Sequence, residues 1–139
     1  MPETLTLYLS RAQIITANER KHWAQTAPVK QVLRALGFKA ALSLPRYERV
    51  RLVVVVSYPD RVARDVANLQ PTMKALVDGM VSGLDGKAPA EAGILPDDND
   101  RYFVGPHMEW SGVLSDKPGR SGSFRFDLTF EALPPLPPA

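Results

Sequence analysis

Residues 49–58 read RVRLVVVVSY, and this stretch decides the fold. Its body is a run of β-branched valines, which favour extended backbone and pack well on a pleated surface. A strand that is apolar on both faces is typical of the middle of a sheet. Pro59 follows directly and ends the run, since proline has no N–H to donate to a neighbouring strand. We therefore expect a central strand over residues 49–58.

Three further segments have the pattern of strands. Thr4–Leu9 reads TLTLYL, and its alternation places three leucines on one face of a half-buried strand. Strands are also expected over Arg101–Trp110 and Gly122–Leu133. The glycines at the ends of Gly112–Gly119 favour a hairpin-like connection between those two strands.

A first helix is predicted over Lys21–Leu42, with Pro28 near its start. Its only interior glycine is Gly37, and Lys30 and Arg34 are expected on its polar side. Apolar residues with helical spacing are expected to face the core: Val29, Val32, Leu33, Leu36 and Ala40.

A second helix is predicted from the spacing of apolar residues between Leu69 and Leu84. Pro71 is compatible with this helix because it lies in the first turn. Gly83 and Gly86 are expected to end it. The apolar positions are Leu69, Met73, Leu76, Val77, Met80 and Leu84.

The order β-α-β-α-β-β predicts an α/β or α+β fold, with a mixed four-stranded sheet and two main helices in one small domain. We expect the domain to cover residues 1–133. The remaining PPLPPA, residues 134–139, is expected to be a disordered proline-rich tail.

The composition excludes several classes of protein. The chain has no cysteine, which rules out disulfides, zinc–thiolate sites and cysteine nucleophiles. The amino-terminal residues do not resemble a signal peptide, and the longest apolar run, Leu52–Val56, is too short to span a bilayer. We therefore expect a cytoplasmic protein without a membrane partner. Gly83–Ala88 lacks the spacing of a phosphate-binding loop, so no nucleotide cofactor is expected.

The charges are unevenly distributed although the formal net charge is only +2. Residues 11–74 contain twelve basic and four acidic side chains, whereas residues 75–139 contain five basic and ten acidic ones. A basic first half suits a polyanion, and an acidic second half suits cations. A mixed, solvated surface is the alternative interpretation.

Two acidic segments carry the functional hypothesis. Residues 64–70 read RDVANLQ, between the central strand and the second helix, and residues 95–100 read LPDDND, just before a strand. Carboxylates that are this close repel one another, and Mg²⁺ or Mn²⁺ is a usual counter-ion for hard oxygen ligands. There are structural alternatives: Asp65 or Asn68 caps a helix, and Asp97–Asn99 forms a turn after Pro96.

The residues RDVANLQPTMKALVDGM (64–80) and GILPDDNDRYFV (93–104) together resemble the core signature of the RusA family of Holliday-junction resolvases. The resemblance covers about Tyr58 to Val104. It implies a small α/β fold and a homodimeric, magnesium-dependent endonuclease that cuts four-way DNA junctions in recombination and repair.

The resemblance also implies roles for single residues. Asp65 matches the first metal-binding carboxylate, and Asp97 and Asp98 match the Asp-Asp pair, in which the second aspartate is counted as catalytic. Asn68 matches the asparagine that follows the family's second aspartate, and we expect it to contact DNA.

The chain departs from the family pattern at two positions. Ala67 stands where the family usually has a second aspartate, and Pro71 where it often has a catalytic lysine. Lys74 lies on nearly the same helix face and is our candidate for that lysine; an ion pair with Asp78 is its alternative role. Asp100 or Asp60 is a candidate for the missing carboxylate.

Basic residues near these segments are the expected DNA contacts, chiefly Arg61 and Arg64, which flank Asp65, and more weakly Lys21, Lys30 and Arg34. The departures at Ala67 and Pro71 leave a second hypothesis open, namely a catalytically weakened protein of the same fold that binds DNA junctions. A third is an interaction domain without a nucleic-acid partner.

Overall fold

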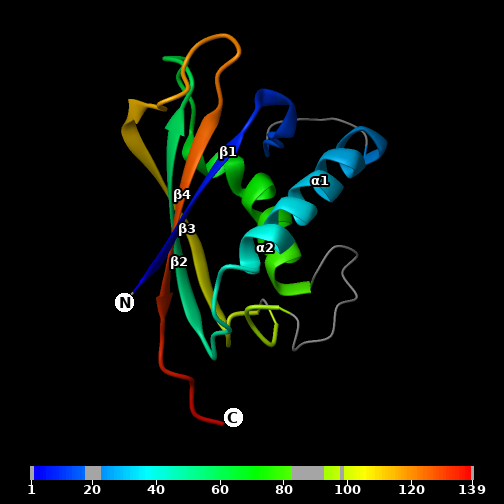
Figure 1. Ribbon diagram of the computed structural model, residues 1–139, viewed down its shortest axis with the longest axis vertical. Helices are drawn as coiled ribbons and strands as arrows, with labels where there is room; N and C mark the ends of the chain where they lie inside the picture. The colour runs from blue at the N-terminus through cyan, green and yellow to red at the C-terminus, as the bar shows by residue number, and fades with distance from the viewer. Residues whose placement is uncertain (1, 18–22, 83–92, 98, 139) are drawn as a thin grey trace.

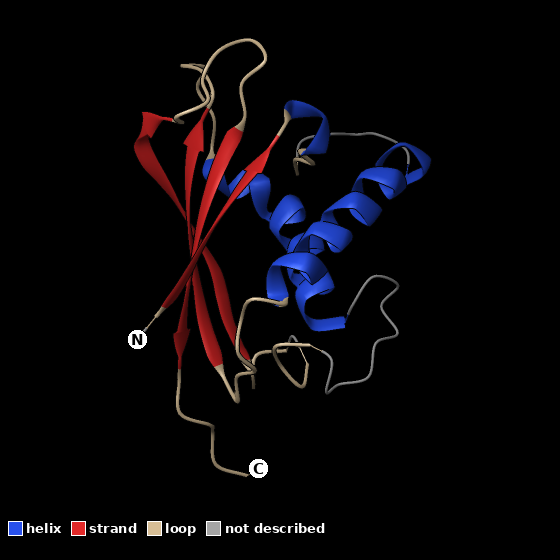
Figure 2. Ribbon diagram, viewed as in Figure 1, coloured by secondary structure: helices blue, strands red, loops and turns tan. Residues whose placement is uncertain are grey.

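The computed structural model describes residues 2–17, 23–82, 93–97 and 99–138. The chain folds into one four-stranded mixed sheet, and two α-helices pack against one of its faces (Figures 1 and 2), which confirms the predicted class. The strands are β1 (Glu3–Leu9), β2 (Val50–Tyr58), β3 (Phe103–Leu114) and β4 (Phe124–Ala132). The helices are α1 (Trp23–Ala41) and α2 (Gln70–Ser82), with short 3-10 helices η1 (Arg11–Gln13) and η2 (Val66–Leu69).

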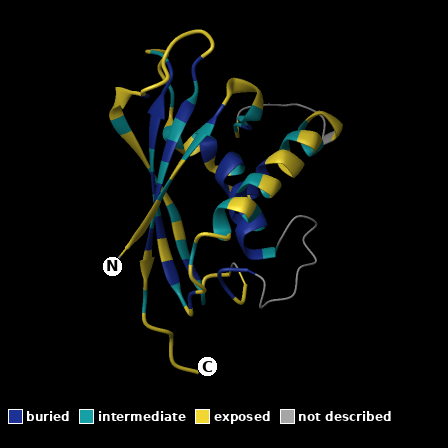
Figure 3. Cartoon of the chain, viewed as in Figure 1, coloured by how far each residue is buried: buried dark blue, intermediate teal, exposed yellow. Residues whose placement is uncertain are grey.

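The valine-rich strand β2 lies inside the sheet, as predicted. The strand order is β1-β4-β2-β3, and β2 pairs parallel with β3 and antiparallel with β4. Alternate β2 residues, from Val50 to Val56, face the helices and are completely buried. They form the centre of the core, which lies between the sheet and the two helices (Figure 3).

The predicted hairpin between the last two strands is wrong. β3 and β4 follow each other in the sequence, but β2 lies between them in the sheet. The connecting segment crosses the end of β2, where the Ser115 and Gly119 N–H groups donate to the carbonyls of Tyr58 and Pro59. Because β2 is apolar on both faces and needs a partner on each edge, pairing β3 and β4 with β2 buries more apolar surface than a hairpin at the edge.

The two helices approach each other closely at a pair of glycines. A Cβ built on Gly37 lies 2.0 Å from the Leu76 carbonyl oxygen, and one built on Gly79 lies 2.0 Å from that of Arg34. This crossing turns the Arg34 position of α1 toward α2 and leaves Val32 45% exposed. The predicted inward position of Val32 and the solvated position of Arg34 are therefore wrong, whereas Leu33 is buried as expected.

The second predicted helix is observed as η2 followed directly by α2, with Pro71 in the first turn of α2. Its predicted core residues from Leu69 to Met80 are buried. Leu84, Gly83 and Gly86 lie outside the described residues. The buried Thr72 hydroxyl donates to the Ile15 carbonyl (2.7 Å) and accepts from the Ile15 N–H (2.9 Å), so it ties α2 to the segment that follows β1.

The carboxyl-terminal residues 133–138 contain neither helix nor strand. The Arg101 guanidinium donates to the Pro137 carbonyl at 2.8 Å, so this part of the tail contacts the domain. Within the described residues, no helix combines the length and the apolar character needed to cross a bilayer.

Candidate functional site

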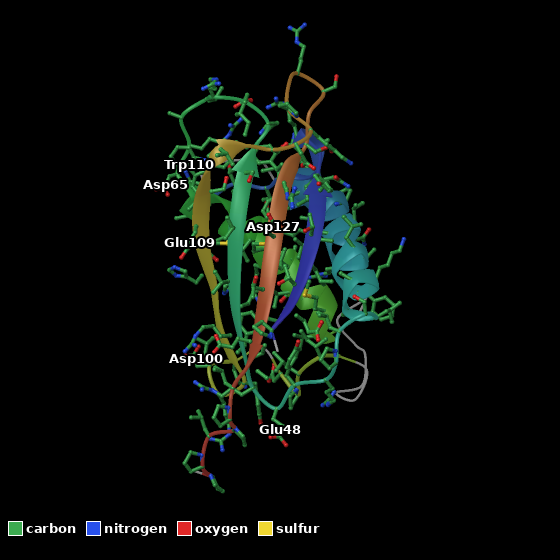
Figure 4. All side chains as sticks on the ribbon, turned by 60° about the vertical axis from the view of Figure 1, so that its left-hand side comes forward. Glu48, Asp65, Asp100, Glu109, Trp110 and Asp127 are labelled. Carbon is green, nitrogen blue, oxygen red and sulfur yellow. The ribbon has the colours of Figure 1, made fainter. Side chains whose placement is uncertain are left out.

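The two acidic segments follow different elements of one strand–helix–strand unit. Asp65 lies after the carboxyl end of β2, immediately before η2, and the Asp97–Asp100 segment lies before the start of β3. β2 and β3 are parallel, and Val50 pairs with Phe103 at their starts. Figure 4 shows Asp65 near one end of β3 and Asp100 at the other.

Asp65 is the N-cap residue of η2. Its side-chain Oδ1 accepts a hydrogen bond from the Ala67 N–H at 3.0 Å, and the side chain is otherwise exposed. An N-cap aspartate satisfies a main-chain donor at the start of a helix and so stabilises the local backbone. The capping alternative for Asp65 is therefore confirmed, and its second carboxylate oxygen is not used by the cap.

The second acidic segment is a turn organised by Asn99. The Asn99 side chain accepts from the Arg101 N–H (3.0 Å) and donates to the Asp97 carboxylate (3.3 Å). The Asn99 carbonyl accepts from the N–H groups of Tyr102 and Phe103, both at 3.0 Å. The observed turn runs from Asn99 to Tyr102, and Asp97 and Asp100 are exposed, so the expected turn over Asp97–Asn99 stays a prediction. Asp98 lies outside the described residues.

The metal site predicted from Asp65, Asp97 and Asp98 requires their carboxylates to converge. Within one chain this is wrong for Asp65 and Asp97. The acidic turn is fixed at the start of β2 by a hydrogen bond from the Val50 N–H to the Tyr102 carbonyl (2.9 Å). Asp65 lies beyond the other end of this nine-residue strand, which spans about 26 Å at the usual rise per residue. The physical cause is the parallel pairing, because the start of β3 must lie beside the start of β2.

Helix α2 also separates Asp65 from the acidic turn. The Ile94 N–H donates to the Met80 carbonyl, which places the segment before the acidic turn at the carboxyl end of α2. Asp65 precedes the amino end of the same helix, and the rise from Gln70 to Met80 is about 15 Å. Among the described residues, no three histidine, aspartate or glutamate side chains gather closely enough to hold a metal ion. One chain therefore does not fit a magnesium site built from Asp65 and the Asp97 turn.

No protein-family model matches the chain, and neither does any curated protein. Membership of the RusA family stays a prediction that depends on residues 64–80 and 93–104.

The arginines predicted to contact DNA differ in their surroundings. Asp60 accepts hydrogen bonds from Arg64 (2.5 and 3.1 Å) and from Arg11 (2.8 Å). The Arg64 guanidinium, followed by that of Arg11, holds the pKa of the Asp60 carboxyl well below its usual range. Arg64 also lies over the Tyr58 ring, 5.1 Å from its centroid. Arg61 is exposed and makes no ion pair with any residue that the structure describes, so it is the cation available to a ligand.

Of the remaining predicted site residues, Asn68 lies in η2 and Lys74 in the first half of α2. Asn68 and Asp65 both line a shallow pocket at the start of η2, and the Asn68 carbonyl accepts from the Ala17 N–H at 2.9 Å. Lys74 makes the ion pair with Asp78 that was its alternative role, with Nζ 2.8 Å from the carboxylate. Lys21 lies outside the described residues.

One feature was missed in the sequence. Trp110, expected only to end a strand, is 60% exposed and stacks on the buried Tyr58, with the ring centroids 6.0 Å apart. In Figure 4 it lies at the same end of the sheet as Asp65. The available signal was a tryptophan followed by Ser111 and Gly112, at a point where the strand pattern loses its apolar alternation.

Proposed function

We propose that this protein is a structure-selective endodeoxyribonuclease that cuts four-way DNA junctions as a homodimer, with magnesium as its metal. The observation that carries the proposal is the placement of Asp65. A helix cap fixes this carboxylate at an exposed element end, and the loop beside it contains Arg61, an exposed cation without an ion pair among the described residues. A fixed carboxylate beside an exposed arginine suits the binding and hydrolysis of a phosphodiester. The similarity of residues 64–80 and 93–104 to the RusA signature supports the same function.

The separation of the two acidic segments adds a requirement. If both segments serve one catalytic site, the site combines Asp65 of one copy with the acidic turn of a second copy, which contains Asp97. In a two-fold dimer such a contact occurs twice, because each copy contributes its opposite end once. Two equivalent sites are what a junction with two-fold related strands requires. The proposed magnesium site is therefore formed by two copies of the chain.

Subunit mixing tests this proposal. Asp65→Asn and the double variant Asp97→Asn/Asp98→Asn should each be inactive on a four-way junction with magnesium present. In a mixed dimer, one site combines the two altered segments and the other combines two intact ones. An equal mixture is therefore expected to recover about a quarter of the wild-type sites. If each site lies within one chain, the mixture stays inactive.

Cross-linking gives a second readout that does not depend on activity. The chain has no cysteine, so introduced cysteines have no native competitor. A chain with both Asp65→Cys and Asp97→Cys is expected to form disulfide-linked dimers under mild oxidation, without metal. The matched control pairs Asp65→Cys with Lys39→Cys on α1. Equal dimer yields from both variants would contradict the shared site.

The runner-up is a protein that binds DNA junctions but cuts them slowly or not at all. Two observations favour it: one Asp65 oxygen is used in the helix cap, and the position two residues later is Ala67. This protein would show salt-dependent binding to a four-way junction, because phosphate contacts release counterions, but no magnesium-dependent cleavage. If the junction is neither bound nor cut, both functions are excluded.

A further inference from the structure

A hollow of about 760 Å³ lies between the loop after β2 and the end of β3. We call it the Trp110 hollow, and its principal lining residues are Tyr58, Arg61, Val62, Trp110, Val113 and Leu114. Three of its apolar side chains are unusually exposed: Trp110 at 60%, Val62 at 61% and Val113 at 65%. Grouped exposed apolar side chains of this size commonly mark a binding surface.

An aromatic stack forms one wall of the hollow. The Tyr58 and Trp110 rings are nearly parallel, with an interplanar angle of 12° and centroids 6.0 Å apart. Tyr58 is buried, and Arg64 and Phe124 pack against its ring. Trp110 is thus supported by a fixed ring, while most of its own surface stays open. Such an arrangement offers a further flat ring a rigid stacking partner at a low cost in side-chain entropy.

The charge beside the stack indicates what kind of ring fits. Arg61 lines the hollow, is exposed and makes no ion pair with any described residue. Arg64, by contrast, is ion-paired with Asp60. A ligand with both a flat aromatic group and a neighbouring negative charge would satisfy Trp110 and Arg61 together. An unpaired nucleotide has this combination, whereas a base inside a duplex has both faces covered by its neighbours.

We propose that the Trp110 hollow binds an unpaired nucleotide of the DNA substrate, with its base stacked on Trp110 and its phosphate beside Arg61. The inference rests on the proposed function, because it takes the substrate to be branched DNA. It assigns a part of the substrate to this site: bases that are unstacked at or near the branch point. Asp65 lies at the same end of the sheet, so a nucleotide held in the hollow positions the adjoining backbone near that carboxylate (Figure 4).

Tryptophan fluorescence tests the stacking directly. The chain has two tryptophans, and Trp23→Phe leaves Trp110 as the sole reporter. A short oligothymidylate titrated into this variant with EDTA present, so that nothing is cut, is expected to quench the emission. A duplex of the same length is expected to quench it less. Trp110→Ala should weaken binding of the single strand by about tenfold or more, whereas Trp110→Phe, which keeps a ring, should retain most of the affinity.

Arg61→Gln tests the phosphate contact. It is expected to weaken single-strand binding and to lower the slope of log affinity against log salt by about 0.7. Lys39→Gln, which removes an exposed cation from α1, is the matched control and should leave both quantities unchanged. Arg61 is exposed, so its variant should keep the thermal midpoint of the wild type. Trp110→Ala also loses the stack on Tyr58 and should melt slightly lower, whereas Trp110→Phe keeps a ring there, and all midpoints can be measured in the same samples.

Two outcomes would overturn the inference. One is unchanged single-strand affinity in Trp110→Ala. The other is a dimer that dissociates in Trp110→Ala without any quenching by DNA, which would assign the hollow to a second copy of the chain. Failure of the proposed function looks different: quenching by single strands persists while four-way junctions stay uncut with magnesium.

Discussion

The two ends of the central strand contain similar types of charged residue but use them differently. At the carboxyl end of β2, Asp60 lies between Arg11 and Arg64, and Arg64 packs on aromatic rings, so the charges are paired and partly buried. At the amino end, the acidic turn is shaped by hydrogen bonds of Asn99, and Asp97 and Asp100 are exposed. A pair held in a partly apolar setting stabilises the fold more than exposed charges do. The comparison therefore assigns a structural role to the Asp60 cluster and leaves Asp65 and the acidic turn for chemistry.

The largest expected effect concerns catalysis at Asp65. Asp65→Asn should lower the rate of junction cleavage by about a thousandfold. Asparagine is also a good N-cap, so the thermal midpoint should stay near that of the wild type. Junction binding, measured by gel shift without metal, should be unchanged or tighter because a negative charge near the phosphates is lost.

Glu131→Gln is the matched control for Asp65→Asn, since it removes an exposed carboxylate that faces Arg51 on another part of the sheet. It should leave the cleavage rate unchanged. Near wild-type cleavage by Asp65→Asn would contradict the catalytic role of Asp65.

A smaller effect is expected from the Asp60 cluster, and it concerns stability. Asp60→Asn removes the negative charge and one of the two acceptor oxygens that bind Arg11 and Arg64, and should lower the free energy of unfolding by about 2 kcal/mol at neutral pH. The pKa of the folded Asp60 carboxyl is lowered, so its stabilising contribution is fully present above the unfolded-state pKa of about 4 and is lost as the pH falls further. The difference in the free energy of unfolding between wild type and variant, measured with urea, should therefore become smaller below that pH. A difference that stays constant into strong acid would contradict the role given to this carboxylate.

The acidic turn is expected to contribute less to stability. Asn99→Ala removes the acceptor for the Arg101 N–H, and the free energy of unfolding should fall by about 1 kcal/mol. Asn99→Asp keeps an acceptor at this position and is the matched control. If Asn99→Ala lowers the free energy of unfolding more than Asp60→Asn does in the same urea series, the acidic turn contributes more to stability than the Asp60 cluster, contrary to the comparison.

The sequence predicted the architecture better than the site, and the reasons are physical. The valine run of β2 and the leucine alternation of β1 determine which face is buried, so both strands were predictable. The two helices were predictable from the helical spacing of their apolar residues. The neighbours of β3 were not, because its pattern does not distinguish a hairpin from a parallel crossover. The prediction of the site was wrong for the same reason. Only the parallel pairing of Val50 with Phe103 shows that Asp65 and Asp97 lie at opposite ends of β2, and the sequence does not reveal this pairing. Arg64 and Arg61 are equivalent in the sequence, and only the Asp60 pairing and the Tyr58 ring separate them.

The smallest expected effect on stability tests whether Lys74 belongs to the chemical or to the structural residues. Its ion pair with Asp78 is on the surface of α2, with the lysine side chain 66% exposed, and exposed pairs of this spacing contribute about 0.3–0.5 kcal/mol. Lys74→Ala should therefore change urea unfolding very little. If Lys74 replaces the lysine missing at Pro71, the same variant should lower turnover by about ten- to a thousandfold, because a cation near the developing phosphate charge is lost. Asp78→Asn breaks the same ion pair but keeps the lysine, so it should cut at the wild-type rate. Equal losses of turnover in both variants would mean that the pair acts through the helix, and a loss confined to Lys74→Ala would place the lysine near the cleaved strand.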